Sequence, residues 1–164
     1  MSSTPDQDGA PELAPGTLEV LQAATRMLAG VALRSLDVLD AAVTLPQFRM
    51  LAVLADLGRV PSGQSARALG LGPSTVTRLA DRLVAAGYVA RGTDPRHRGV
   101  VTLELTADGR DLVATADAWR RQELTRIMAR LAPAEQEAVT AAIRKLIGAA
   151  GDDYGIAAPH PVPV

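Results

Sequence analysis

A predicted helix that begins at Pro73 carries hydroxyl and guanidinium groups on the face opposite its apolar stripe: Ser74, Thr75, Thr77 and Arg78. Hydroxyls can hydrogen-bond to bases or phosphates, and an arginine can bind guanine through two parallel hydrogen bonds. These residue types favour contact with base edges in the major groove of a duplex. A solvated face with capping hydroxyls is the alternative. Thr75 borders the apolar stripe, and Arg82 could contact a phosphate or pair with Asp81.

A second charged group lies on the loop between two predicted strands, residues 88–91 and 100–105. The loop tip carries Arg96, His97 and Arg98, and Arg91 lies at its base. The negative potential of a minor groove attracts arginine. We therefore expect the tip to enter or border a minor groove and Arg91 to contact a phosphate. An ordinary charged hairpin is the alternative.

A third polar group opens a short predicted helix, residues 62–69. Ser62, Gln64 and Ser65 could donate hydrogen bonds to phosphates near the start of this helix. Ser62 could equally serve only as the cap of its own helix.

Positive charge is concentrated over these groups, although the chain of 164 residues has a net charge of −1. Residues 78–98 hold five arginines against two aspartates, and the rest of the chain holds twelve basic and sixteen acidic residues. A uniformly solvated surface would not separate charge in this way. The separation therefore favours a polyanionic partner for this segment.

The elements that position these side chains follow each other closely. The helix over 62–69, a Gly-Leu-Gly turn at 70–72, a helix ending at Gly87 and two strands predict a helix-turn-helix with a basic wing. A shape of this kind fits the major groove. Thr44 with Gln47 predicts the capped start of the preceding helix, which ends at Gly58, and Thr106 predicts the start of the following one.

Long helices are predicted at both ends of the chain, over residues 17–39, 107–131 and 133–149. They carry more apolar surface than a small winged helix can cover, which indicates a helical interface between two chains. Two such chains would contact half-sites roughly 34–36 Å apart. Val139, Ile143, Leu146 and Ile147 are expected to form the inner face of the last helix. We expect Trp119 to anchor packing at the interface, with the wall of a ligand site as the alternative.

The expected fold is mainly α, a winged helix-turn-helix domain with a long-helix dimerisation region from both chain ends. We expect the chain to divide into five parts: a disordered arm (1–16), a dimerisation helix (17–43), the winged helix-turn-helix (44–106), further dimerisation helices (107–149) and a disordered tail (150–164).

Several functional classes find no support in the composition. The chain has no cysteine, and its two histidines, His97 and His160, offer no metal site or histidine-based triad. No apolar run has the length of a membrane helix, and the acidic, proline-rich start is unlike a signal peptide. We therefore expect a cytoplasmic protein that is not an enzyme, carries no cofactor or metal and does not enter a membrane.

The ordered set of motifs resembles the multiple antibiotic resistance regulator (MarR) family of bacterial winged-helix transcription factors, over about residues 17–148. The matching residues are Gln64, Ser65, Leu69, Ser74, Thr75, Val76, Thr77, Arg78, Leu79, Asp81, Arg82, Leu83, Gly87, Leu105, Thr106 and Gly109. One departure concerns the wing. Members of the family usually carry an Asp-x-Arg motif near the wing tip. In this chain His97 and Gly99 occupy the positions of its aspartate and arginine. Arg96 and Arg98 flank these positions and could take over a minor-groove contact.

The resemblance implies a homodimeric transcriptional regulator, most often a repressor, on a pseudo-palindromic operator in double-stranded DNA. It also implies a small-molecule effector, often aromatic, in the cleft between the dimer helices and the winged helix. The lack of cysteine excludes the thiol-oxidation switch of the family, and the scarcity of histidine argues against its zinc-sensing branch. A winged-helix dimer that binds proteins, without sequence-specific DNA binding, is the alternative function.

Overall fold

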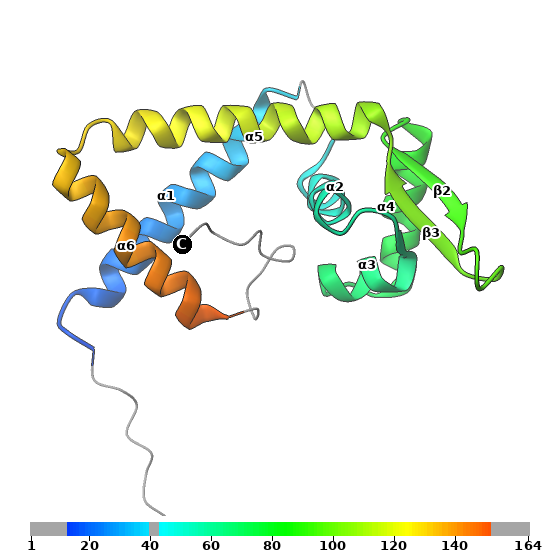
Figure 1. Cartoon of the computed structure of the whole chain (residues 1–164), viewed down its shortest axis with the longest axis horizontal. Coiled ribbons are helices and arrows are strands. Elements are labelled where there is room, and N and C mark those ends of the chain that lie inside the picture. Colours follow the sequence, from blue (N-terminus) through cyan, green and yellow to red (C-terminus); the bar gives the residue numbers. More distant parts are fainter. Residues whose placement is uncertain (1–12, 40–42, 152–164) are drawn as a thin grey trace, which may run out of the picture.

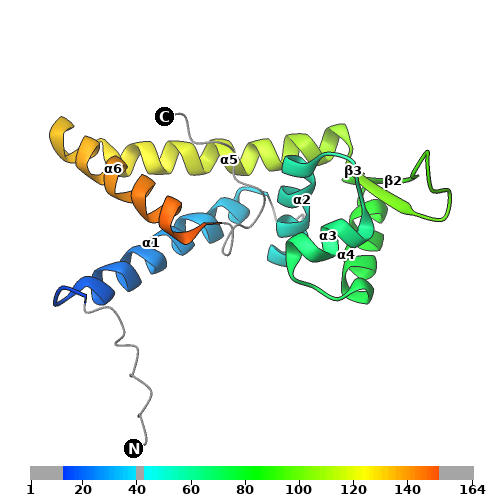
Figure 2. The same ribbon diagram turned by 60° about the horizontal axis from the view of Figure 1, so that its bottom comes forward.

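The computed structural model describes residues 13–39 and 43–151. In these ranges the elements are α1 (Thr17–Asp37), α2 (Leu45–Leu57), β1 (Val60–Pro61), α3 (Ser62–Leu69), α4 (Pro73–Ala85), β2 (Val89–Thr93), β3 (Val101–Leu105), α5 (Ala107–Met128) and α6 (Pro133–Ala150). The long helix α5 connects the two ends of the molecule (Figure 1). The head, which comprises α2–α4 and β1–β3, packs at one end of α5, and α1 and α6 lie at the other end, the stem (Figures 1 and 2). The mainly helical fold and the winged helix-turn-helix are confirmed.

The predicted capping signal does begin α2. The Gln47 Oε1 atom accepts a 2.8 Å hydrogen bond from the Thr44 amide and another of 2.8 Å from the Thr44 hydroxyl. The helix buries Phe48 and Leu51 and ends at Gly58, where φ is 69°. α2 therefore forms the centre of the head, on which α3, α4 and α5 pack.

The helix-turn-helix also follows its local signals. α3 ends at Gly70 with a φ of 64°, which glycine adopts without steric cost. Pro73 occupies the first turn of α4, and the apolar stripe of this helix is buried: Val76, Leu79, Ala80 and Leu83. The Tyr88 amide then donates to the Leu83 carbonyl over 2.9 Å and closes the helix end at Gly87. The opposite face of α4 therefore points away from the core.

The three strands form an antiparallel sheet in the order β1-β3-β2. β1, of two residues, was not predicted, and it pairs Val60 with Leu103 on β3. On β3 the Leu103 side chain is buried, whereas Val101 at the outer end of the strand is 46% exposed. The hairpin of β2 and β3 extends beyond the helices of the head (Figure 1), so its outer residues have no core to face. This hairpin is the wing.

A close approach fixes the junction between the wing and α5. The Thr106 hydroxyl accepts from the Gly109 amide over 3.1 Å, which confirms the predicted cap of α5. A Cβ on Gly109 would lie 2.1 Å from the Tyr88 carbonyl oxygen. Only glycine fits at this position, because the contacting atom belongs to the backbone and cannot swing aside.

The stem leaves much apolar surface uncovered in the single chain. α6 has no buried residue, and its predicted inner face exposes Ile143 by 44% and Leu146 by 51%. α1 packs on α5 but leaves further large apolar side chains exposed: Leu18, Val20, Leu21, Met27, Leu28 and Leu33. The single chain therefore leaves exposed the side of α6 that was predicted to be its inner face.

The described part of the chain reaches only a little way into the predicted arm and tail. Most of the predicted disordered arm and tail lies outside the described residues, and α1 begins at Thr17 as predicted. Among the described helices, none combines the length and the apolar character needed to cross a bilayer.

Candidate nucleic-acid interface

The outer face of α4 presents most of the side chains predicted for base contact. Ser74, Thr77 and Arg78 are exposed, and Thr75 is half-buried at the border of the apolar stripe. The Thr77 hydroxyl donates to the Pro73 carbonyl over 3.0 Å, so its oxygen keeps both lone pairs and can still accept hydrogen bonds. This face can therefore offer a guanidinium and hydroxyl groups to base edges.

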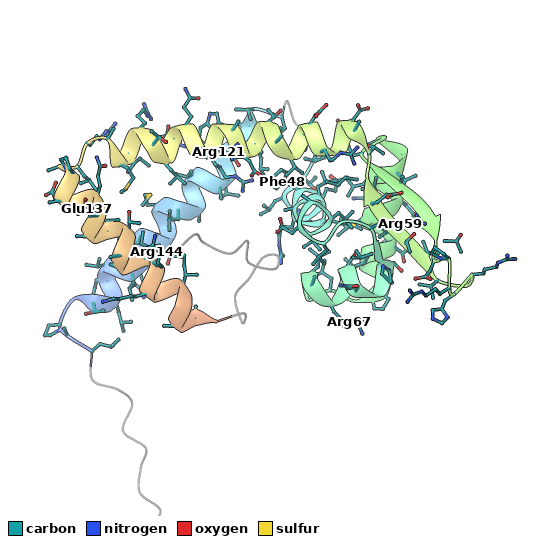
Figure 3. The ribbon with its side chains drawn as sticks, viewed as in Figure 1. Phe48, Arg59, Arg67, Arg121, Glu137 and Arg144 are labelled. Carbon is teal, nitrogen blue, oxygen red and sulfur yellow. The ribbon has the colours of Figure 1, made fainter. Side chains whose placement is uncertain are left out.

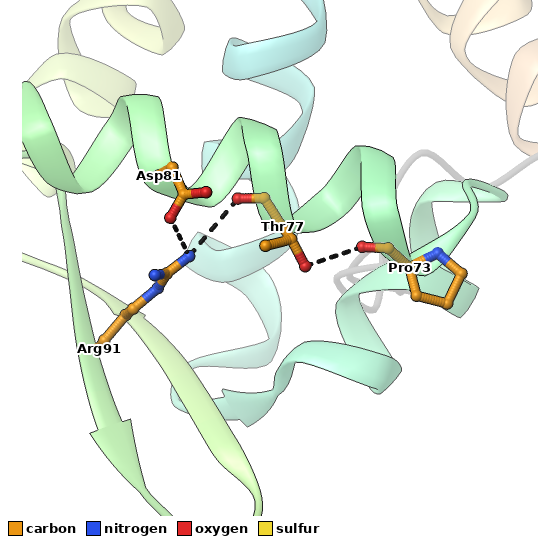
Figure 4. Close-up of polar contacts among 4 residues, drawn as sticks. All are labelled: Pro73, Thr77, Asp81 and Arg91. Carbon is orange, nitrogen blue, oxygen red and sulfur yellow. Dashed lines mark hydrogen bonds and ion pairs between the residues drawn. The ribbon is translucent and has the colours of Figure 1, made fainter.

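An ion pair joins the wing to α4. Arg91 on β2 places its Nη2 atom 2.7 Å from the Asp81 carboxylate and 3.5 Å from the Thr77 carbonyl oxygen (Figure 4). The alternative that Arg82 pairs with Asp81 is therefore wrong in this structure, since Asp81 pairs with Arg91. Both partners are partly exposed, and such pairs contribute about 0–1 kcal/mol to stability. A phosphate contact by Arg91 would have to share this guanidinium with Asp81.

The residues on α3 are placed differently from one another. Gln64 is exposed, as a phosphate contact requires. Ser65 is 0% exposed, and its hydroxyl has no hydrogen-bond partner within the described residues. Its predicted phosphate contact is therefore wrong, because the side chain points into the head. Ser62 is half-buried as the first residue of α3, and Pro61 holds the cap position that we had allowed for Ser62.

The wing tip is a hydrogen-bonded turn organised by Asp94. Its Oδ1 atom accepts from the Arg96 amide over 2.7 Å and from the His97 amide over 3.1 Å. The Val100 amide donates to the His97 carbonyl over 2.8 Å. The side chains of Arg96, His97 and Arg98 are exposed. The chain thus has His97 where the family has an aspartate. Asp94, three residues earlier, instead holds the tip turn together by accepting hydrogen bonds from two backbone amides. Asp followed by Pro predicts a turn, although not these two bonds.

Sequence reasoning missed one arginine of the head. Arg59 donates from Nε to the Thr102 hydroxyl over 3.1 Å and from Nη2 to the Thr93 carbonyl over 2.9 Å. It lies at the edge of the wing sheet (Figure 3). Its partners are 43 and 34 residues away in the sequence, so no local pattern could have revealed these contacts.

Hollows along α5 include one at the head and one in the stem. A groove of about 440 Å³ runs between α2, β3 and α5 and combines apolar and charged lining residues: Leu54, Ala55, Gly58, Arg59, Glu104, Leu105, Arg110, Val113, Ala114 and Asp117. A hollow of about 280 Å³ in the stem is lined by Trp119 and by residues of α1, including Arg26 and Arg34. Trp119 is half-buried and lines this hollow, so its role as a packing anchor at the interface between chains stays a prediction.

Two titratable side chains of the stem influence each other. Beside the stem hollow, a hydrogen bond from Arg126 lowers the pKa of Glu123, and the same bond raises the pKa of Arg126. Within the described residues no group of three or more His, Cys, Asp or Glu side chains is arranged to hold a metal ion.

Comparison with known proteins supports the family assignment. The sequence model of the MarR family matches residues 43–98. The HTH-type transcriptional regulator YcgE of Bacillus subtilis, itself uncharacterised, is 45% identical over 56 residues, which span 34% of this chain and only 36% of that protein. The crystal structure of RV1404 from Mycobacterium tuberculosis matches with a TM-score of 0.80 and 33% identity, over 88% of this chain and 99% of that one. BpsR of Bordetella bronchiseptica, described with 6-hydroxynicotinic acid as the regulator of its DNA binding, matches with a TM-score of 0.57 and 27% identity, over 84% and 97%. The shared winged helix-turn-helix, the ordered α4 motif and the matches along nearly the whole fold place this chain in the MarR family.

Proposed function

We propose that this protein is a DNA-binding transcriptional regulator that binds a pseudo-palindromic operator as a homodimer. The observation that carries the proposal is the exposed face of α4, where Arg78 and two hydroxyls lie opposite a fully packed apolar stripe. The wing of the same head carries further exposed arginines at its tip. A helix in the major groove and a wing in the adjacent minor groove would use both sets.

The uncovered stem supports the homodimer. Large apolar side chains on α1 and α6 are exposed by a third or more, among them Leu18, Leu28, Leu146 and Ile147. Contiguous apolar surface of this kind marks an interaction site in soluble proteins. A second copy of the chain is the occupant that would also supply a second α4, as a two-fold symmetric operator requires.

A small-molecule effector is part of the proposal. The groove between α2, β3 and α5 lies where the head meets the long helix, and its lining combines apolar side chains with two arginines, Arg59 and Arg110, and two acidic residues, Glu104 and Asp117. The apolar side chains could hold an aromatic ring and the two arginines its carboxylate, so we propose an amphipathic aromatic acid, the class to which the 6-hydroxynicotinic acid of BpsR belongs. A ligand that binds one spacing of the two heads more tightly shifts the population between DNA-binding and non-binding states.

The mode of regulation and the location in the cell are also part of the proposal. We propose repression as the mode of regulation, because an operator-bound dimer most simply blocks access to a promoter. A regulator of chromosomal DNA acts in the cytoplasm of a bacterium, so the proposal includes that location.

Fluorescence anisotropy with duplexes from the region upstream of the gene tests the proposal. We expect one duplex to bind far more tightly than scrambled DNA, with an affinity that falls steeply as salt rises because phosphate contacts release counterions. Arg78→Ala should lower the affinity for that duplex and leave the melting temperature unchanged. Equal binding to every duplex, or none, would refute the proposal and favour a protein-binding winged helix instead.

A further inference from the structure

Arg59 bridges the strands of the wing from the head. It directly precedes β1, which pairs with one edge of β3, while β2 pairs with the other edge. Its guanidinium crosses β3, where Nε donates to the Thr102 hydroxyl over 3.1 Å, and reaches β2, where Nη2 donates to the Thr93 carbonyl over 2.9 Å. One side chain thus connects the beginning of β1 to the last residue of β2.

The sequence of β2 leaves room for this guanidinium. A Cβ on Gly92 would lie 2.6 Å from Arg59 Nη2 and 3.0 Å from the Thr102 hydroxyl oxygen. Gly92 stands directly opposite Thr102 in the strand register, so the guanidinium rests on this pair. Thr102 is only 4% exposed although it lies on a projecting hairpin. The missing side chain at residue 92 therefore matches the position of the arginine.

The wing is held from both faces. Neighbouring residues of a strand point to opposite faces of the sheet. Arg91 faces α4, where it pairs with Asp81 over 2.7 Å, and Gly92 faces the other way, under Arg59. Asp94, which orders the tip through two backbone amides, follows Thr93 directly. The bond from Arg59 to the Thr93 carbonyl therefore fixes the point at which the tip turn begins.

We propose that Arg59 is a positioning residue for DNA binding, which holds the wing at the angle to α4 at which its tip arginines reach the minor groove. The inference rests on the proposed function. Arg59 acts here through Thr93 and Thr102, and its contribution comes from geometry and not from its charge. A planar guanidinium can donate to both acceptors at once, whereas the single ammonium of a lysine cannot reproduce this fork.

Two substitutions disturb the bridge from opposite sides. Arg59→Gln removes the guanidinium, and Gly92→Ala displaces it while keeping the arginine and its charge. We expect each to weaken operator binding by about tenfold, which corresponds to about 1.4 kcal/mol. The double variant should be no weaker than either single variant, because both break the same contact. Arg59→Lys should lose nearly as much as Arg59→Gln. Arg121→Gln, which removes one charge from the exposed surface of α5 away from the wing (Figure 3), should bind as the wild type does.

Three further measurements separate positioning from a phosphate contact or a general loss of stability. Hydroxyl-radical footprints of Arg59→Gln should lose protection only in the flanking minor grooves. In the background of Arg96→Ala with Arg98→Ala, Arg59→Gln should weaken binding no further. Melting temperatures should stay unchanged, while the amides of Asp94 and Val100, which lie in the tip turn, exchange hydrogen faster than in the wild type.

The outcomes distinguish this inference from the proposed function. Suppose that the wild-type protein binds its operator specifically. If Arg59→Gln or Arg59→Lys then binds the operator with the affinity of the wild type, the proposed function still holds and the positioning role is refuted. Additive losses for Arg59→Gln and the tip variant would also overturn it, since they indicate a direct contact by Arg59. A wild-type protein without specific binding would refute the function. In that case the Asp94 amide still tests the bridge. Unchanged hydrogen exchange of this amide in Arg59→Gln would show that Arg59 does not hold the tip turn, and faster exchange would show that it does.

Discussion

Removing apolar side chains from α6 tests whether the stem joins two copies of the chain. We predict that Ile143→Ala with Leu146→Ala greatly weakens self-association. These side chains are 44% and 51% exposed in the single chain, so a partner could still bury about half of each. Complete burial of such a side chain is worth about 1.5–3 kcal/mol, and half of it about 1 kcal/mol.

The two-fold symmetry of a dimer multiplies this effect. Each substitution acts once in either copy, so four truncated side chains would cost up to about 4 kcal/mol, or about a thousandfold in the dissociation constant. Sedimentation equilibrium over a range of protein concentrations measures this constant directly. Val101→Ala is the control, because Val101 is 46% exposed but lies on the wing.

The result that refutes the reasoning is a double variant that associates as tightly as the wild type, or a control that dissociates equally. Either result would mean that α6 is not the face that joins two copies. A wild-type protein that stays single at high concentration would contradict the homodimer altogether.

Three further predictions concern single residues of the head. Ser65→Ala should stabilise the fold by about 1 kcal/mol in chemical denaturation, because it removes a buried hydroxyl without a partner; a loss of stability would reveal a partner for that hydroxyl. Asp94→Ala should weaken operator binding by about 1 kcal/mol without lowering the melting temperature, since the tip loses two bonds to its amides; full affinity would show that the turn needs no aspartate. Gly109→Ala should lower the melting temperature by several degrees, because its Cβ would lie 2.1 Å from a backbone oxygen; an unchanged melting temperature would mean that the start of α5 shifts freely.

Local chemistry explains why much of the fold could be predicted from the sequence. The pair of Thr44 and Gln47 and the turn at Gly70 each act within a few residues. The apolar spacing of α4 likewise determines which of its faces is buried. Signals of this range are present in the sequence itself, and the structure follows them closely.

The corrections have a common cause, which is contact between segments far apart in the sequence. Ser65 appeared suited to a phosphate contact, but the packing of the head buries it. Arg82 was a possible partner of Asp81, but the fold of the hairpin brings Arg91 to Asp81 instead. Arg59 gave no signal, because its partners become neighbours only once the sheet has formed.

A hydroxyl-radical footprint of the wild-type protein on its operator, compared with that of Arg78→Ala, tests the central claim most directly. We predict two protected regions about one turn of DNA apart, each flanked by a protected minor groove, and the loss of both regions in Arg78→Ala. A single protected region, protection spread evenly over the duplex, or a footprint that Arg78→Ala leaves intact would contradict it.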